Sequence, residues 1–416
     1  MKVLVSAYAC QPEKGSEPGI GWNWVRQIGC IHQVWAITRS KNRASIETAL
    51  AEKPLPNAHF VYFDLPCWAR FWRKDNRGIR LHYYLWQLAA YFQARKLHRE
   101  ITFDLIHHVT YGSYWRPVFL SLLPVPFVWG PIGGGESAPR AFWSSYGLRG
   151  KAYEVLRDLA RALGARDPFV RLTARRAAVA LAATEETKTQ LKALGCRKVS
   201  VCSNAALPAE ELQGLSSIPF RQGNPFRLLS VGRLLHWKVF ELGLKAFAQF
   251  HRQFPESEYW IIGEGPERKR LEKLAREMEV TRSVSFWGAL PRSEVLGKLA
   301  ECDVLVHPSW HDSGGWVCLE AMAAGRPVSC LDLGGPGLQV TGQTGIKVPA
   351  ISPPQAIADL AAAMGQLAGD PDRRLRLGRS ARLRAAEHFA WDKKGEQMNQ
   401  IYHSIQSIRT TQARSE

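Results

Sequence analysis

The feature that most constrains the fold is a repeated alternation of short apolar, β-branched segments with longer amphipathic ones. This alternation is typical of β-α-β units, in which helices cover both faces of a parallel sheet. It runs through residues 2–202 and starts again at residue 226. A chain of 416 residues is also longer than one hydrophobic core usually supports. The sequence therefore predicts an α/β protein with two doubly wound domains.

The domain boundaries follow from the same pattern. Residues 1–204 are predicted to form an N-terminal domain and residues 225–388 a C-terminal domain. Residues 205–224 are polar and contain Gly and Pro, so a linker is expected there. Residues 389–416 are expected to form a helix that packs back on the N-terminal domain. The expected strands lie near residues 2–8, 33–38, 59–63, 103–108, 126–129, 179–183, 198–202, 226–231, 258–262, 284–287, 304–307, 328–331 and 345–348.

Charge is distributed unevenly along the chain. The formal net charge is +18, and residues 1–220 hold 29 basic and 16 acidic residues, a net of +13. Residues 68–100 combine eight Lys or Arg with eight aromatic residues and only two acids, which favours contact with an anionic membrane surface. A solvated basic face is one alternative. Nucleic acid is another, but no helix-turn-helix or ribonucleoprotein pattern supports it.

A membrane-spanning helix is not predicted. No stretch has the roughly 18 consecutive apolar residues that such a helix needs. The apolar run at the start of the sequence is too short for a signal peptide. We therefore expect a cytoplasmic protein that is peripheral on the inner face of the cytoplasmic membrane.

The most informative segment is HPSWHDSGGWVCLEAMAAGRPV, at residues 307–328. Its predicted strand is followed by Asp312, Ser313, Gly314 and Gly315. A helix is expected from Trp316, and its unpaired N–H groups would attract an anion such as a diphosphate. Glu320 lies one turn inside this helix, where a buried carboxylate needs a partner such as a sugar or ribose hydroxyl. A simple turn and an internal ion pair are the structural alternatives.

A second segment, VGRLLHWKVFELGLKAF at residues 231–247, places two cations in one loop. Arg233 and Lys238 follow a predicted strand and precede a predicted helix. Two converging cations suit a pyrophosphate leaving group, because negative charge grows on that group as its bond to a sugar breaks. Alone, such a pair would more often be surface charge.

Together these segments resemble the retaining, nucleotide-sugar-dependent glycosyltransferases of family 4, also called glycosyl transferases group 1. The resemblance covers nearly the whole chain and implies the GT-B fold, with two Rossmann-like domains facing a central cleft. In that family two acids eight positions apart precede an Ala-x-Ala-x-Gly-x-Pro-Val pattern, as Asp312 and Glu320 do here. The first acid is usually Glu, so Asp312 is a departure.

The resemblance also assigns roles to residues of the C-terminal half. Arg233, Lys238 and Asp312 are expected to act in catalysis together with a histidine. Glu320 is expected to bind ribose, while Gly263 and Gly288 border the base. The donor-binding residues implied in this way are Arg233, Lys238, Gly263, Gly288, Asp312, Ser313, Gly314, Gly315, Trp316, Val317 and Glu320.

The N-terminal half should supply the catalytic histidine and the acceptor loops. His107 and His108 end a predicted strand and face opposite sides; the resemblance favours His108, and a hydrogen-bonded core histidine is the alternative. Two loops are expected to line the acceptor or diphosphate side. They contribute Gly15, Glu17, Gly19, Gly21, Gly134 and Glu136.

No metal and no other cofactor is expected. Arg233, Lys238 and a helix start would neutralise the diphosphate, and Asp370 and Asp372 around Pro371 indicate a helix start. The predicted activity is transfer of a hexose from a UDP- or GDP-sugar to a glycan or lipid-linked acceptor in cell-envelope or exopolysaccharide synthesis. A phosphorylase would need a pyridoxal-phosphate lysine, which nothing singles out. The remaining alternative is an inactive GT-B scaffold that binds anionic surfaces or nucleic acid.

Overall fold

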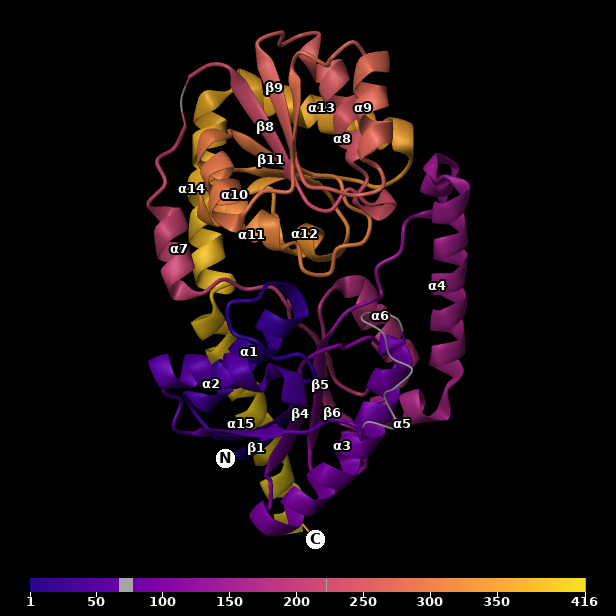
Figure 1. The fold of residues 1–416 in the computed structure, drawn as a ribbon, viewed down its shortest axis with the longest axis vertical. Helices are drawn as coiled ribbons and strands as arrows, with labels where there is room; N and C mark the ends of the chain where they lie inside the picture. Colours follow the sequence, from indigo (N-terminus) through magenta and orange to yellow (C-terminus); the bar gives the residue numbers. More distant parts are fainter. Residues whose placement is uncertain (67–77, 222, 416) are drawn as a thin grey trace. The chain divides into compact units, whose positions relative to one another are not determined.

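The computed structural model describes residues 1–66, 78–221 and 223–415. Contacts divide the chain into two compact units (Figure 1). Unit 1 comprises residues 1–135, 156–204 and 391–416, and unit 2 comprises residues 136–155 and 205–390. Residues 68–77 of the predicted membrane stretch lie outside the described ranges, among them Trp68, Arg70, Arg73, Lys74 and Arg77.

Unit 1 is built on a parallel seven-stranded sheet with the order β3-β2-β1-β4-β5-β6-β7. Consecutive residues of the central strands, such as Val3, Leu4 and Val5, are fully buried, as expected for a sheet covered on both faces. The strands are β1 Lys2–Ser6, β2 Gln33–Thr38, β3 Ala58–Tyr62, β4 Leu105–His108, β5 Phe127–Ile132, β6 Ala177–Ala182 and β7 Val199–Val201.

Helices connect these strands. α1 packs against α15 within unit 1, although the two helices are far apart in sequence (Figure 1). The α-helices are α1 Ser16–Gly29, α2 Arg43–Glu52, α3 Ile79–Ile101, α4 Leu148–Arg166, α5 Pro168–Arg176, α6 Glu185–Ala193 and α15 Trp391–Ser415. Short 3-10 turns are η1 Ser40–Asn42 and η3 Phe119–Leu122. The first part of α4, up to Val155, belongs to unit 2.

Unit 2 has a parallel six-stranded sheet with the order β10-β9-β8-β11-β12-β13. Its strands are β8 Phe226–Val231, β9 Ser257–Ile262, β10 Val284–Gly288, β11 Val304–His307, β12 Val328–Leu331 and β13 Gly345–Val348. Its helices are η4 Arg140–Ser145, α7 Ala209–Ser216, η5 His236–Lys238, α8 Phe240–His251, α9 Arg268–Glu277, α10 Arg292–Glu301, α11 Trp316–Ala323, α12 Gly334–Gln339, α13 Pro353–Gly369 and α14 Pro371–His388.

The predicted α/β class and the two parallel sheets are confirmed. The predicted helix start at Asp370 is also confirmed, because α14 begins at Pro371 and the Asp370 carboxylate accepts a hydrogen bond from the Arg373 amide at 2.8 Å. Such a cap satisfies an N–H group that the helix itself leaves unpaired.

The chain divides differently from the predicted boundaries at two places. Residues 205–224 belong to unit 2, where α7 packs against α11 and α14 and buries Leu212 and Leu215. They are therefore not a separate linker. Residues 136–155 also join unit 2, whereas the prediction placed them in the N-terminal domain. Residues 391–416, by contrast, belong to unit 1.

Among the described residues, no helix is both long and apolar enough to cross a membrane.

Candidate donor site

The predicted donor residues of unit 2 follow the carboxyl ends of neighbouring strands. The loops after β8, β9 and β10 meet through backbone contacts at Gly263, whose amide donates to the Gly288 carbonyl at 2.7 Å. A Cβ atom at Gly263 would lie 1.9 Å from the Gly232 carbonyl oxygen, and its φ is +141°. Only glycine fits there, because it has no Cβ atom and so allows the loops to pack closely. This contact lies at the edge where parallel sheets bind ligands.

Asp312 is the centre of the polar network at this edge. One carboxylate oxygen accepts from the Lys238 ammonium at 2.5 Å and from His307 Nε2 at 3.0 Å. The other accepts from the amides of Gly315 at 2.8 Å and Gly314 at 3.2 Å. Burial alone would raise the pKa of Asp312, but the Lys238 charge and the His307 hydrogen bond hold that pKa well below its usual range. The structure thus brings Lys238 and an ionised Asp312 into direct contact.

Helix α11 begins beside this carboxylate. Gly315 precedes it with a φ of 58°, and a Cβ there would lie 2.8 Å from Gln339 Oε1. The Gln339 amide donates to the Gly314 carbonyl at 2.5 Å and fixes the turn. Trp316 and Val317 form the first turn of the helix, where backbone N–H groups lack intrahelical partners. This end of α11 can therefore bind an anion.

Arg233 lies in the loop after β8, and its side chain is exposed. It forms no ion pair with another residue in the described ranges. Lys238, in the same loop, is paired with Asp312. Of the two predicted cations, one is therefore held by a carboxylate and the other is open to solvent.

Glu320 is buried in α11, and its described partner is a cation. Arg292 Nη1 lies 2.9 Å from one carboxylate oxygen of Glu320, and Arg292 also pairs with Glu211. Burial raises the pKa of Glu320 to about 7, against the opposing effect of the Arg292 charge. The ion-pair alternative is therefore present in the structure, and ribose binding by Glu320 stays a prediction.

We expect Glu320 to make stability depend on pH. Its folded-state pKa of about 7 exceeds the ordinary value of 4.5, so the folded state retains a proton that the unfolded state releases. The contribution of this retained proton to the free energy of unfolding is fully present below pH 4.5 and is lost as pH rises towards 7. Glu320→Gln cannot titrate, so the difference in free energy of unfolding between variant and wild type should change across this window in urea titrations. A difference that stays constant would contradict the expectation.

In unit 1, the predicted loop is shorter than expected, because Gly19 and Gly21 lie inside α1 and only Gly15 precedes the helix. A Cβ at Gly19 would lie 1.9 Å from the Lys14 carbonyl oxygen, and one at Gly21 would lie 2.0 Å from that of Ala9. Gly15 has no such neighbour within 4 Å. The close approach is therefore to other backbone of the same unit.

Glu17, in the first turn of α1, is also engaged within unit 1. It accepts a hydrogen bond from the Tyr111 amide at 2.8 Å. Burial raises the pKa of Glu17, against the opposing effects of this hydrogen bond and of Arg116. Contact of Glu17 with an acceptor stays a prediction.

His107 and His108 are both buried in unit 1 with both ring nitrogens hydrogen-bonded. His108 contacts the Tyr83 hydroxyl at 3.0 Å and Ser6 Oγ at 3.1 Å. His107 contacts the Tyr402 hydroxyl and the Gly130 carbonyl, each at 2.6 Å. Burial lowers the pKa of His108 to about 3 and that of His107 to about 4, so both rings are neutral. In the structure both residues are hydrogen-bonded core histidines, as in the alternative interpretation. A contact of His108 with sugar would require its ring to lose the hydrogen bond to Tyr83 or to Ser6.

The two remaining candidates fall in different units. Gly134 belongs to unit 1, where it has a φ of +97° and a Cβ would clash with the Trp115 ring at 2.4 Å. Glu136 belongs to unit 2, is buried, and its carbonyl accepts from His311 Nδ1 at 3.1 Å. The structure does not group them in one unit.

Several residues of the site were not predicted. They are the Asp312 partner His307, the Glu320 partner Arg292, the turn-fixing Gln339, and His311 with its partner Glu154. No local motif marks these contacts, because each depends on loops brought together by the fold. Among the described residues, no group of three or more His, Cys, Asp or Glu lies where it could hold a metal ion.

Solved structures share this architecture at low sequence identity. The lipopolysaccharide outer core galactosyltransferase WaaB aligns over 97% of this chain and 99% of its own, with a TM-score of 0.64 and 13% identity. Anabaena HepE in complex with UDP aligns over 97% and 100%, with a TM-score of 0.62 and 17% identity. The two parallel α/β sheets therefore define a GT-B fold.

The sequence is similar to known proteins over parts of its length. Residues 216–384 match the model described as Glycosyl transferases group 1. The glycogen synthase of Mycobacterium tuberculosis is 36% identical over 43% of this chain. The 2-deoxystreptamine glucosyltransferase of Streptomyces kanamyceticus is 29% identical over 331 residues, which are 74% of this chain and 78% of that protein. The matched segment therefore resembles the glycosyl transferases group 1 family, and the model covers less than half of the 416 residues.

Coverage of the relatives differs. The aligned part spans 42% of the glycogen synthase and 45% of the D-inositol 3-phosphate glycosyltransferase of Corynebacterium jeikeium. Less than half the length of these two curated relatives is therefore matched.

Proposed function

We propose that the protein is a retaining glycosyltransferase that moves a hexose from a nucleoside-diphosphate sugar to a glycan or lipid-linked acceptor. One observation carries the proposal: Lys238 and the amino end of α11 meet around Asp312 at the carboxyl edge of the unit 2 sheet. Relatives support it, since the Streptomyces protein is named a glucosyltransferase and the HepE structure contains UDP. UDP is therefore the first candidate carrier and GDP the second.

The site's charges suit departure of a diphosphate. As the bond between the sugar and the diphosphate oxygen breaks, negative charge grows on the leaving group. Lys238, Arg233 and the first N–H groups of α11 would stabilise that charge, because preorganised donors act most strongly where charge develops. An entering diphosphate competes with Asp312 for the Lys238 ammonium, which is 2.5 Å from that carboxylate before the donor arrives. With these donors, the proposed reaction requires no metal ion to neutralise the diphosphate.

The remaining roles are assigned from the expected donor pose. Asp312 would hold the hexose, and Glu320 would accept hydrogen bonds from the ribose hydroxyls after Arg292 shifts. Gly263 and Gly288, which touch through their backbones, would border the base. The acceptor would bind on unit 1 near Glu17, with His108 beside the transferred sugar.

A thermal-shift panel of UDP-, GDP- and ADP-sugars tests the donor. A true donor at 100 times its dissociation constant should add about 2.7 kcal/mol of stability. The same donor should give a smaller shift with Lys238→Ala. If no nucleotide sugar raises the melting temperature, the proposal fails. Hydrolysis of the bound donor then separates an enzyme from an inactive scaffold that only binds nucleotides.

We also propose that unit 1 rests on an anionic membrane surface in the cytoplasm, close to a lipid-linked acceptor used in envelope or exopolysaccharide synthesis. The described part of the predicted stretch supports this through α3, where Phe92 is 60% exposed beside exposed Arg95, Lys96 and Arg99. Each basic residue near an anionic surface contributes about 1 kcal/mol. Exposed leucines of α4, such as Leu156 at 66%, add apolar area in the same unit.

Liposome flotation measures this binding. Anionic vesicles should carry the protein at low salt and lose most of it at high salt, because the Debye length falls from about 10 Å at 0.1 M to about 3 Å at 1 M. Replacing Arg95, Lys96 and Arg99 with Glu should abolish flotation. The same triple charge reversal at Lys269, Lys273 and Arg276, exposed residues of α9 in unit 2, should not. Equal flotation with neutral vesicles would rule the proposal out.

A further inference from the structure

A buried carboxylate contacts both loops that carry the charged donor residues. Glu154 lies in the part of α4 that belongs to unit 2, and its side chain is 2% exposed. His311 Nε2 lies 3.1 Å from both carboxylate oxygens, and His236 Nε2 lies 3.4 Å from one of them. His311 directly precedes Asp312, and His236 is two residues before Lys238. The two loops are therefore joined through Glu154 as well as through the Lys238–Asp312 ion pair.

Ring packing strengthens the same connection. Tyr153 stacks on Trp237 with ring centroids 5.2 Å apart and an interplanar angle of 16°. Tyr146 meets Trp310 edge to face at 4.8 Å. The Trp310 amide donates to the Trp237 carbonyl at 3.0 Å, which ties one loop to the other directly. Residues 136–155 thus pack on the backs of both loops.

We propose that Glu154 is a positioning residue for the donor site. A buried carboxylate is tolerated only with partners, so its negative charge holds both histidines in place. Asp312 and Lys238 are thereby also held in position, because each lies one or two residues along the backbone from one of these histidines. The effect of Glu154 on the two loops does not depend on the reaction. Its effect on the rate of sugar transfer rests on the proposed function.

Hydrogen–deuterium exchange of the full chain tests the effect on the loops. Glu154→Gln keeps the side-chain size but removes the charge, so exchange should become faster in peptides covering residues 232–240 and 307–316. Unchanged exchange in either loop would overturn the proposal. If this variant lowers the melting temperature more than the control described next, His311→Ala replaces it, and exchange should then rise in 307–316.

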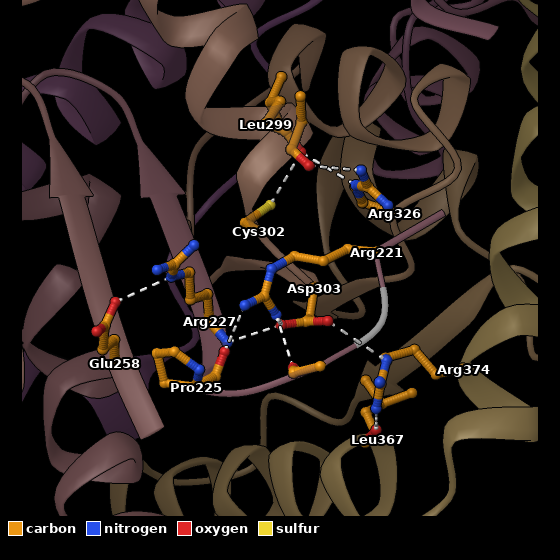
Figure 2. Close-up of polar contacts among 12 residues, drawn as sticks. Arg221, Pro225, Arg227, Glu258, Leu299, Cys302, Asp303, Arg326, Leu367 and Arg374 are labelled. Carbon is orange, nitrogen blue, oxygen red and sulfur yellow. Dashed lines mark hydrogen bonds and ion pairs between the residues drawn. The ribbon is translucent and has the colours of Figure 1, made fainter. Parts of the chain in front are cut away.

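Asp303 offers a matched control. It is another buried carboxylate of unit 2, at the amino end of β11, opposite the end that carries Asp312. Figure 2 shows it paired with Arg221, accepting from the Arg227 amide at 2.8 Å and facing Arg374 at 3.7 Å. Asp303→Asn should destabilise the unit without faster exchange in either donor loop. If Asp303→Asn accelerated both loops equally, the Glu154 effect would be general loosening and the proposal would fail.

Kinetics with UDP-glucose as the probe, or GDP-glucose if only that binds, tests the effect on transfer. Glu154→Gln should lower kcat/KM about 10-fold or more, since a misplacement of about 1 Å can cost about 10²-fold. In an Asp312→Asn background the same change should cost much less, because coupled residues are not additive. Full additivity would overturn the positioning role. A wild type that binds neither sugar nucleotide refutes the proposed function, and the exchange experiment still decides the role of Glu154.

Discussion

We expect the replacement of Lys238 with alanine to lower the rate of sugar transfer by about 10²–10³-fold. This is the effect of removing one preorganised hydrogen-bond donor to a developing negative charge. Arg233→Ala should fall in the same range. The fold should persist in both variants, since Arg233 is exposed and Lys238 lies at the edge of the sheet. Initial rates with a saturating donor and circular dichroism measure the two effects.

Lys245→Ala is the appropriate control for charge. Lys245 lies in the following helix, α8, and pairs with Glu241. The substitution removes one positive charge from the same unit without touching Asp312, so the transfer rate of this variant should stay near that of the wild type. A wild-type rate in Lys238→Ala would show that the diphosphate binds elsewhere.

Asp312→Ala should depress transfer about 10²-fold while sparing affinity for UDP. The structure gives the reason, because Asp312 holds the Lys238 ammonium at 2.5 Å before the donor binds. Without that carboxylate, Lys238 is free for the diphosphate, so product affinity is maintained. The hexose loses its anchor, and the amides of Gly314 and Gly315, which directly precede α11, lose their hydrogen-bond acceptor.

Glu320→Ala should behave in the opposite way and weaken UDP as well as UDP-sugar. Titration calorimetry of both variants with UDP separates the two roles. An equal loss of UDP affinity in Asp312→Ala and Glu320→Ala would contradict this division between hexose and ribose.

The strands could be predicted because buried parallel strands leave a clear pattern in the sequence. Val304–His307 and Val328–Leu331 are continuous buried runs, and Gly and Pro residues lie in the segment 308–315 after the first run and in the segment 324–327 before the second. The expected linker at 205–224 was wrong for a related reason. Its helix, α7, has only eight residues and two buried leucines, which is too little periodicity to stand out from polar loop sequence.

The donor site was predictable only where the chemistry lies next to a strand end. Lys238 and Asp312 both follow strands of one sheet, and parallel strands place such loops side by side. The contact between Glu154 and His311 could not be predicted in this way. It joins residues 157 positions apart, and residues 136–155 carry no signal of the unit on which they pack.

The assignment of residues 391–416 to unit 1 has a consequence for the order in which the protein is made. All seven strands of unit 1 have been translated by Val201, yet α15 follows the whole of unit 2. The Tyr402 hydroxyl that meets buried His107 at 2.6 Å is therefore absent while unit 2 is being synthesised. On the ribosome, the unit that is started first is the last to be completed, and its partly covered sheet must remain soluble until α15 arrives.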